Sequence, residues 1–320
     1  MRTVDEPTGV DTKRDESDAK RDGSPPSPVD RTETTSIDRV GAALVLLSAV
    51  GFGTLGIFGL YAQEVGISIP TLLMYRFLAA ALLLWGVLAW RGTVSVLRGR
   101  TLLVAMGLGT FGYATMSGLY FLGLEFMTAG MVAIVLYTYP AFVVVLAAVS
   151  IGESIGGRTL VALALTLGGV TLVVGADPAG ASVIGVVILL CAALAYATYI
   201  VVSRAVLDTV DPLTLAAHVL PASGVTFAAI AAATGELVVP TGASAWAILV
   251  GIAVVATALP VYAFFTGLER IGASRAGILS TVEPPVTVFL GALLFAEPVT
   301  GLTVAGGALV LGGVIVVQSG

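Results

Sequence analysis

Ten long apolar runs follow one another along this chain, separated by short polar stretches. They lie near residues 40–63, 68–90, 101–122, 127–151, 157–175, 181–203, 213–235, 245–268, 275–296 and 301–317. At 1.5 Å per residue, helices of about 18 to 25 residues cross a hydrocarbon layer about 30 Å thick. The runs are apolar on every face, which favours helices over the alternating strands of a transmembrane barrel. The predicted fold is an all-α polytopic membrane protein with ten transmembrane helices.

The composition agrees with this prediction. The chain is 57% hydrophobic and 11% charged, whereas a soluble domain carries about 25% charged residues. Much of the charge lies in residues 1–39, which are rich in Asp, Glu, Arg, Ser and Pro, so we predict a disordered cytoplasmic tail there. The single cysteine, Cys191, falls within the sixth run and excludes an intramolecular disulfide or a thiolate metal cluster.

The second half of the sequence repeats the first. Residues 121–173 recur without a gap as residues 265–317, and the matched pairs are Pro140 with Pro284, Glu153 with Glu297, and Leu167–Val170 with Leu311–Val314. We predict two repeats of five helices, spanning residues 40–176 and 181–318. Five is an odd number, so the second repeat enters the membrane from the opposite side. Such inverted repeats are typical of carriers that expose a central site to each side in turn.

The arginines indicate how the chain is oriented. Apart from Arg76 they lie in the tail, which ends with Arg31 and Arg39, and then in or beside alternate connections, at Arg91, Arg98, Arg100, Arg158, Arg204, Arg270 and Arg275. Positively charged connections stay on the cytoplasmic side. The pattern predicts that both termini are cytoplasmic, and it supports the count of ten helices.

The repeated residues resemble those of the EamA-type carriers of the drug/metabolite transporter superfamily. The resemblance rests on Pro140, Glu153 and the Leu-Gly-Gly-Val sequence at 167–170, together with Glu283-Pro284, Glu297 and its copy at 311–314. It covers about residues 40–318. It implies a secondary carrier, with a cavity between the halves, that exports amino acids or other metabolites.

Two titratable side chains stand at related places in the second and seventh runs. Arg76 lies about two turns into its helix, where an unpaired guanidinium costs about 3 kcal/mol or more. It suits a substrate carboxylate or phosphate, and the alternatives are structural pairing or reaching to the interface. Aligning Pro70 with Pro212 puts His218, the only histidine, at the place of Arg76. His218 is a candidate for proton transfer, with hydrogen-bonded packing as the alternative.

Glu283 lies inside the ninth run and directly precedes Pro284 and Pro285. Prolines remove backbone donors and break a helix, as we also expect at Pro140, and so leave carbonyls free for a ligand or an ion. A carboxyl group beside such a break can take up and release a proton, which would couple transport to a gradient. The alternatives are a neutral Glu283 or a structural bridge to Arg76.

Tyrosines and hydroxyl side chains at mid-span depth are candidates to line the cavity. They are Tyr113, Ser117, Tyr120, Tyr137, Thr138, Tyr139, Tyr196, Tyr199, Tyr262, Ser280 and Thr281. The same residue types also serve helix packing and interfacial belts. Tyr139 is the strongest candidate because it occupies the place of Glu283 in the first repeat, and Tyr113 and Tyr196 join it in the predicted substrate site.

Other recurring residues favour structural roles. Glu153 and Glu297 end their runs, and we expect them to stabilise the turn that follows. Gly51–Gly56 and Gly107–Gly112 match G-x-G-x-x-G, but inside apolar helices their glycines allow close approach or line a pore. Ala164 with Gly168, and Ala308 with Gly312, are expected to form close-packing faces.

Two other classes of protein fit less well. An intramembrane enzyme needs a convergent nucleophile and base or a metal cluster, and a channel needs a repeated pore-lining motif; the sequence contains neither pattern. A non-transporting receptor belongs with the channel as the second alternative. We therefore expect a carrier of the plasma membrane and no enzymatic activity. Its expected partners are a small-molecule substrate and the lipid bilayer, with no nucleic acid, cofactor or metal. The oligomeric state is open.

Overall fold

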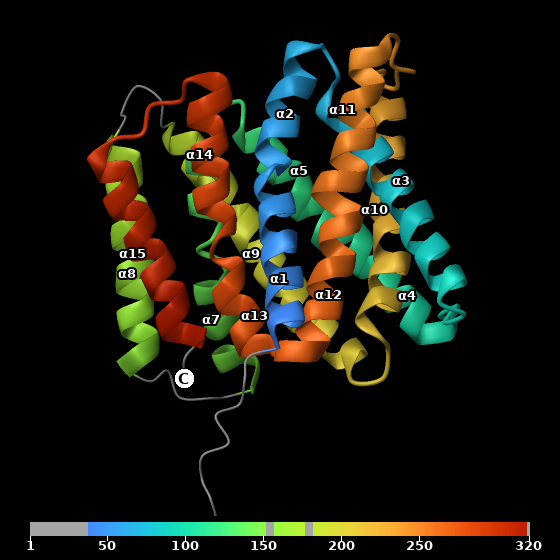
Figure 1. The fold of residues 1–320 in the computed structure, drawn as a ribbon, viewed down its shortest axis with the longest axis horizontal. Helices are drawn as coiled ribbons and strands as arrows, with labels where there is room; N and C mark the ends of the chain where they lie inside the picture. Colours follow the sequence, from blue (N-terminus) through green and yellow to red (C-terminus); the bar gives the residue numbers. More distant parts are fainter. Residues whose placement is uncertain (1–37, 152–156, 177–181, 319–320) are drawn as a thin grey trace, which may run out of the picture. The chain divides into compact units, whose positions relative to one another are not determined.

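The computed structural model of the protein describes residues 38–151, 157–176 and 182–318. Nearly all of the predicted tail, and Glu153, lie outside the described residues. Within them all regular secondary structure is helical, and the helices form ten membrane-crossing stretches, as predicted (Figure 1). The start of α1 and the end of α15 lie at the same edge of this bundle (Figure 1).

The ten stretches contain fifteen α-helices and two π-helical turns. In chain order they are α1 (Arg39–Gly53) with α2 (Leu55–Glu64); α3 (Ile69–Trp90); α4 (Gly99–Gly107), η1 (Leu108–Tyr113) and α5 (Ala114–Gly123); α6 (Ala129–Leu136) with α7 (Tyr139–Ile151); α8 (Gly157–Ala176); α9 (Val183–Leu207); α10 (Pro212–Thr234); α11 (Ala243–Ala253), η2 (Val254–Ala258) and α12 (Leu259–Ile271); α13 (Ala273–Ser280) with α14 (Glu283–Phe295); and α15 (Gly301–Gln318).

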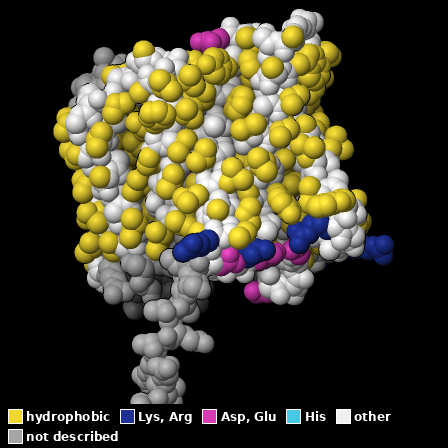
Figure 2. Space-filling view, in the orientation of Figure 1, with side chains coloured by type: hydrophobic (Ala, Val, Ile, Leu, Met, Phe, Trp, Pro, Cys, Tyr) yellow, Lys and Arg dark blue, Asp and Glu magenta, His cyan; other side chains and the backbone are white. Residues whose placement is uncertain are grey.

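Seven of these stretches are long and apolar enough to cross a membrane by length and composition alone. Shorter apolar helices, at Ala129–Val143, Leu160–Val173 and Gly301–Val316, complete the set of ten. The face drawn in Figure 2 is covered by apolar side chains over most of its height, and its Lys and Arg side chains gather along the lower edge. This is the surface expected of a multi-pass membrane protein.

The interruptions of the helices recur in both repeats. The third stretch contains η1 and the eighth contains η2, while the fourth is broken before Pro140 and the ninth before Pro284. Pi-helical turns and proline breaks expose backbone groups that a regular helix would use internally. The π-helical turns and the proline breaks thus interrupt regular helix at equivalent places in the two repeats. In the part of the chain that the structure describes, only the first repeat has a further break inside a stretch, at Thr54.

The helices of the two repeats pack in a pseudo-twofold arrangement. Equivalent helices pair with each other, as α3 does with α10 and α8 with α15. The contact of α1 with α12 is mirrored by that of α9 with α5, and the contact of α1 with α14 by that of α9 with α7. The chain is thus built as two five-helix repeats related by inversion across the membrane.

Glycines bring α8 and α15 into close contact. A Cβ atom on Gly169 would lie 2.5 Å from the carbonyl oxygen of Gly306, and one on Gly306 would lie 2.5 Å from that of Gly169. Gly313 approaches the carbonyl of Ala162 in the same way. The predicted packing face was therefore wrong by one residue: a Cβ atom on Gly168 or Gly312 would meet nothing within 4 Å, and the next glycine makes the contact.

The other glycine prediction holds in the first helix. A Cβ on Gly51 would collide with Pro260, one on Gly53 with Val286, and one on Gly56 would come close to Ala129 and Tyr120. These glycines let α1 and α2 lie directly against helices of both repeats.

Candidate functional site

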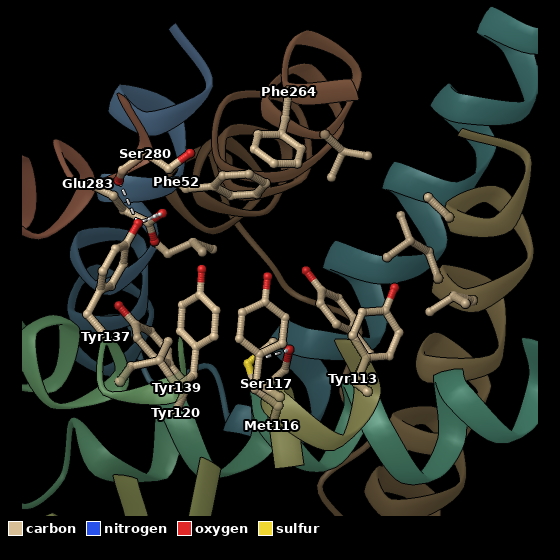
Figure 3. A pocket seen from close by; sticks show the side chains of 18 of the residues that line it. Phe52, Tyr113, Met116, Ser117, Tyr120, Tyr137, Tyr139, Phe264, Ser280 and Glu283 are labelled. Carbon is tan, nitrogen blue, oxygen red and sulfur yellow. Dashed lines mark hydrogen bonds between the residues drawn. The ribbon is translucent and has the colours of Figure 1, made fainter. Parts of the chain in front are cut away.

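A cavity of about 200 Å³ lies between the two repeats. Side chains from the first four stretches of each repeat line it, whereas the paired helices α8 and α15 do not contribute. Six of the nine tyrosines face it, namely Tyr113, Tyr120, Tyr137, Tyr139, Tyr196 and Tyr199. In Figure 3 the labelled tyrosines rise from one side of the cavity, with Phe52 and Phe264 on the opposite side. The cavity therefore has an aromatic lining with many hydroxyl groups.

Arg76 of α3 lies in this cavity and is 2% exposed. Its Nε donates a hydrogen bond of 2.9 Å to Thr257 Oγ1 in η2, and the Thr257 hydroxyl donates to the carbonyl of Ile252. The π-helical turn thus places an oxygen that holds the guanidinium. The Arg76 Cζ also lies 4.7 Å from the centre of the Phe77 ring, within the range of a cation–π interaction.

The charge of Arg76 has no carboxylate partner among the described residues. The single ion pair there joins Arg270 to Asp38 at the start of α1, at 3.2 Å. Arg76 and Glu283 line the same cavity without forming the structural bridge that was the alternative interpretation. A guanidinium has five N–H donors; the bond to Thr257 uses one, and the hydroxyl of Tyr113 is a further polar neighbour. The cavity therefore contains a buried cation without a carboxylate partner among the described residues.

Glu283 begins α14, at the break in the ninth stretch, and lines the cavity. Pro284 has no amide hydrogen, so the carbonyl of Ser280, four residues earlier, lacks its helical donor. The hydroxyl oxygen of Tyr137 lies 2.6 Å from that carbonyl oxygen and 2.9 Å from Glu283 Oε2 (Figure 3). Of the carbonyls predicted to be free for a ligand, that of Ser280 is therefore occupied by a tyrosine of the other repeat.

The tyrosine rings form a continuous row along the cavity. Tyr137 contacts Tyr139 with ring centres 5.8 Å apart, and Tyr139 contacts Tyr196 at 4.7 Å. Tyr196 stacks on Tyr199 at 6.1 Å, and Tyr199 contacts Tyr113 at 5.4 Å. The row runs from Tyr137 beside Glu283 to Tyr113, whose ring centre lies 5.6 Å from that of Phe77, next to Arg76. The sequence analysis named Tyr113, Tyr139 and Tyr196 as candidates for the substrate site, and all three lie in this row.

His218 does not line the cavity, which corrects its predicted place. Its Nδ1 lies 2.8 Å from the carbonyl of Thr214, its Nε2 accepts from the amide of Leu97 at 3.2 Å, and its ring packs against Trp85. A ring that donates through Nδ1 and accepts through Nε2 is a neutral imidazole held by packing. Both nitrogens are thus used inside the protein.

The helix caps explain why the alignment placed His218 wrongly. Ser68 caps α3 by accepting from the amide of Thr71, and Asp211 caps α10 by accepting from that of Thr214. The caps are 143 residues apart, whereas Pro70 and Pro212 are 142 apart. One residue turns a helix by about 100°. The true counterpart of Arg76 is Val219, which lines the cavity.

Of the remaining candidates, Ser117 and Ser280 line the cavity, and Thr138, Thr281 and Tyr262 do not. The two threonine hydroxyls donate to carbonyls of the helices that precede them, those of Val135 in α6 and Ile278 in α13. Sequence reasoning also missed the apolar lining residues Phe52, Met116 and Phe264. Their residue types are the same as those that face lipid, so the sequence carries no signal that separates them.

Glu297 has a different structural role from the one predicted. Its Oε1 accepts from the amide of Ala129 at 2.7 Å and its Oε2 from that of Gly130 at 3.2 Å. The carboxylate thus caps the first turn of α6, in the other repeat, where the helix dipole favours negative charge. It joins the two repeats instead of stabilising its own turn.

Among the described residues no three His, Cys, Asp or Glu side chains are grouped to hold a metal ion. What the cavity offers is a fixed cation, a carboxyl group and a row of aromatic hydroxyls between two inverted repeats. A fold and site of this kind define a membrane transporter of the inverted-repeat class.

Comparison with known proteins agrees with this class. The EamA-like transporter family matches residues 39–175 and 183–319. An "Uncharacterized transporter YcbK" of Bacillus subtilis is 30% identical over 291 residues, covering 88% of this chain and 92% of that protein. An "Uncharacterized transporter" of Archaeoglobus fulgidus is 29% identical over 278 residues, covering 87% and 96%. The chain therefore belongs to the EamA-like transporter family, within the drug/metabolite transporter superfamily.

A solved structure described as "Crystal structure of protein" shares the fold. It superposes with a TM-score of 0.64 at 20% identity, over 86% of this chain and 95% of the other. The family and the names of the relatives point to a transporter.

Proposed function

We propose that the protein is a secondary-active carrier that exports small carboxylated metabolites, such as amino acids or related organic compounds. The observation that carries this proposal is a buried arginine, Arg76, in a cavity shared by two inverted repeats and without a carboxylate partner among the described residues. The planar fork of a guanidinium suits a carboxylate. The adjoining aromatic row suits a partly apolar body.

The proposed transport cycle is alternating access between the two repeats. It is supported by the pairing of equivalent helices and by breaks at equivalent places, because two similar halves can exchange conformations at low cost in free energy. In this cycle Arg76, Tyr113, Tyr139 and Tyr196 contact the substrate. Glu283 takes up and releases the coupling proton.

The proposed location is the plasma membrane, with both termini in the cytoplasm. Arg91, Arg98, Arg100 and Arg270 all lie at helix ends in connections that the positive-inside rule assigns to the cytoplasm. The start of α1 and the end of α15 lie on one side of the bundle, in agreement with an even number of crossings. The proposed partners are the lipid bilayer and a small-molecule substrate.

The test is an efflux screen followed by reconstitution. Cells with and without this chain are loaded with a panel of amino acids and other carboxylated metabolites, and the excreted compounds are compared. The compound with the largest difference is then offered to proteoliposomes with an imposed pH gradient. Accumulation against its concentration gradient, abolished by a proton ionophore, is the expected result. Gradient-independent flux of many small ions would instead indicate a channel.

A further inference from the structure

The contact of Tyr137 with Glu283 and Ser280 joins the two helix breaks. Tyr137 ends α6 of the first repeat, and the other two residues flank the break between α13 and α14 of the second. Its hydroxyl oxygen lies within hydrogen-bonding distance of two oxygens, the Ser280 carbonyl and Glu283 Oε2. This is a direct polar connection between the repeats, inside the cavity.

A tyrosine hydroxyl has one hydrogen to donate, and a carbonyl oxygen can only accept. If the Tyr137 hydrogen points to Ser280, the contact to Glu283 is a hydrogen bond only when Glu283 is protonated and donates to the tyrosine oxygen. If Glu283 is ionised, it attracts the tyrosine hydrogen, because bonds to charged acceptors are the stronger ones. The carbonyl that Pro284 leaves without a donor then loses its partner.

We propose that Tyr137 is a positioning residue that couples the protonation state of Glu283 to the contact between the two helix breaks. With Glu283 protonated, one chain of bonds runs from its hydroxyl through Tyr137 to the Ser280 carbonyl and holds the breaks together. With Glu283 ionised, Tyr137 turns to the carboxylate and releases the carbonyl. This inference deepens the proposed proton coupling and rests on it.

The other titratable and charged groups near Glu283 do not make this contact. The cavity also contains Arg76 and five further tyrosines, which come from α3, α5, α7, α9 and the end of η1. None of them forms a hydrogen bond or ion pair with Glu283 among the described residues. The helix α1 packs against α14, and the residue that it presents to the cavity there, Phe52, does not titrate. Tyr137 is thus the side chain placed to sense this proton.

The experiment is an infrared titration of the purified protein in lipid nanodiscs. The carboxylic acid band of Glu283 is the part of the spectrum lost in Glu283→Gln, and its midpoint is measured against pH. Tyr137→Phe removes the donor to the ionised form, so we expect its midpoint to move up by about one pH unit. The matched control, Tyr139→Phe, keeps the wild-type midpoint, because Tyr139 lies in the same row without that bond.

A second substitution tests the direction of the midpoint shift while keeping the tyrosine hydroxyl. The incorporation of 3-fluorotyrosine at position 137 keeps the shape and makes the hydroxyl a stronger donor, so the midpoint should fall below that of the wild type. Unmoved midpoints in both Tyr137 proteins, or an equal shift in Tyr139→Phe, would overturn the inference. The midpoint could rise in Tyr137→Phe and fall with 3-fluorotyrosine while the wild-type protein fails to accumulate substrate under a pH gradient. That result would support the inference and refute the proposed proton-coupled transport.

Discussion

The two proline breaks have the same backbone and different side chains. The amide of Thr138 bonds to Val135 before Pro140, and the amide of Val282 bonds to Leu279 before Pro284, so the turn itself is repeated. The first break places Tyr139 in the cavity, and the second places Glu283 there. In the proposed cycle, the repeated backbone provides the two halves that exchange conformations, and the side chains that differ between the repeats bind the substrate and the proton.

The largest expected effect comes from making the second break as uncharged as the first. Glu283→Gln removes the titrating group and keeps its shape, so proteoliposomes should lose gradient-driven accumulation while exchange of internal and external substrate persists. Glu269→Gln is the control, because Glu269 lies exposed on α12, outside the cavity. Uphill transport at the wild-type rate in Glu283→Gln would refute the assignment.

The seventh stretch offers a second comparison, between Arg76 in the cavity and Val219 at its place in the other repeat. Arg76→Ala should weaken binding of a carboxylated substrate about 10- to 100-fold, the value of one or two hydrogen bonds to a charged group. Equilibrium binding and thermal unfolding are measured together. Affinity equal to that of the wild type would assign Arg76 to structure alone.

His218 should show the opposite behaviour to Arg76. His218→Ala removes two hydrogen bonds and the packing on Trp85, so the free energy of unfolding should fall by about 2 kcal/mol. Substrate affinity should stay within twofold of the wild type. A large loss of affinity at unchanged thermal stability would return His218 to the substrate site.

The smallest expected effect is at Glu297, where a charge of one repeat caps a helix of the other. Glu297→Gln keeps a hydrogen-bond acceptor and removes the charge, so stability should fall by about 0.5 to 1 kcal/mol. Thermal unfolding at low and high salt checks this, since the helix-dipole contribution is screened by salt. A loss that is the same at both salt concentrations would mean that packing, and not charge, is responsible.

The sequence was sufficient for the architecture. The apolar runs and the repeat predicted ten helices, their inverted arrangement and the breaks before Pro140 and Pro284. The same repeat pointed to Tyr139 and Glu283; both line the cavity, and their roles in transport stay predictions. The inferences about architecture succeed because run length and repeat spacing are properties of the chain itself.

What failed was the assignment of helix faces. These helices are apolar all round, so the sequence carries little periodic signal to tell the face of Gly168 from that of Gly169, or the direction of His218 from that of Val219. The partners of Tyr137 and Glu297 lie in the other repeat, and sequence spacing does not show which side chains meet there. Tertiary packing decides both.

The central claim is that one cavity between the repeats opens to each side in turn. Ser117 lines it and is close in size to cysteine, so Ser117→Cys on a Cys191→Ser background reports access with little change of shape. The rate of reaction with a membrane-impermeant thiol reagent is measured from each side, with and without substrate. We predict labelling from both sides, with substrate raising one rate and lowering the other. Labelling from one side only, in every condition, would contradict alternating access.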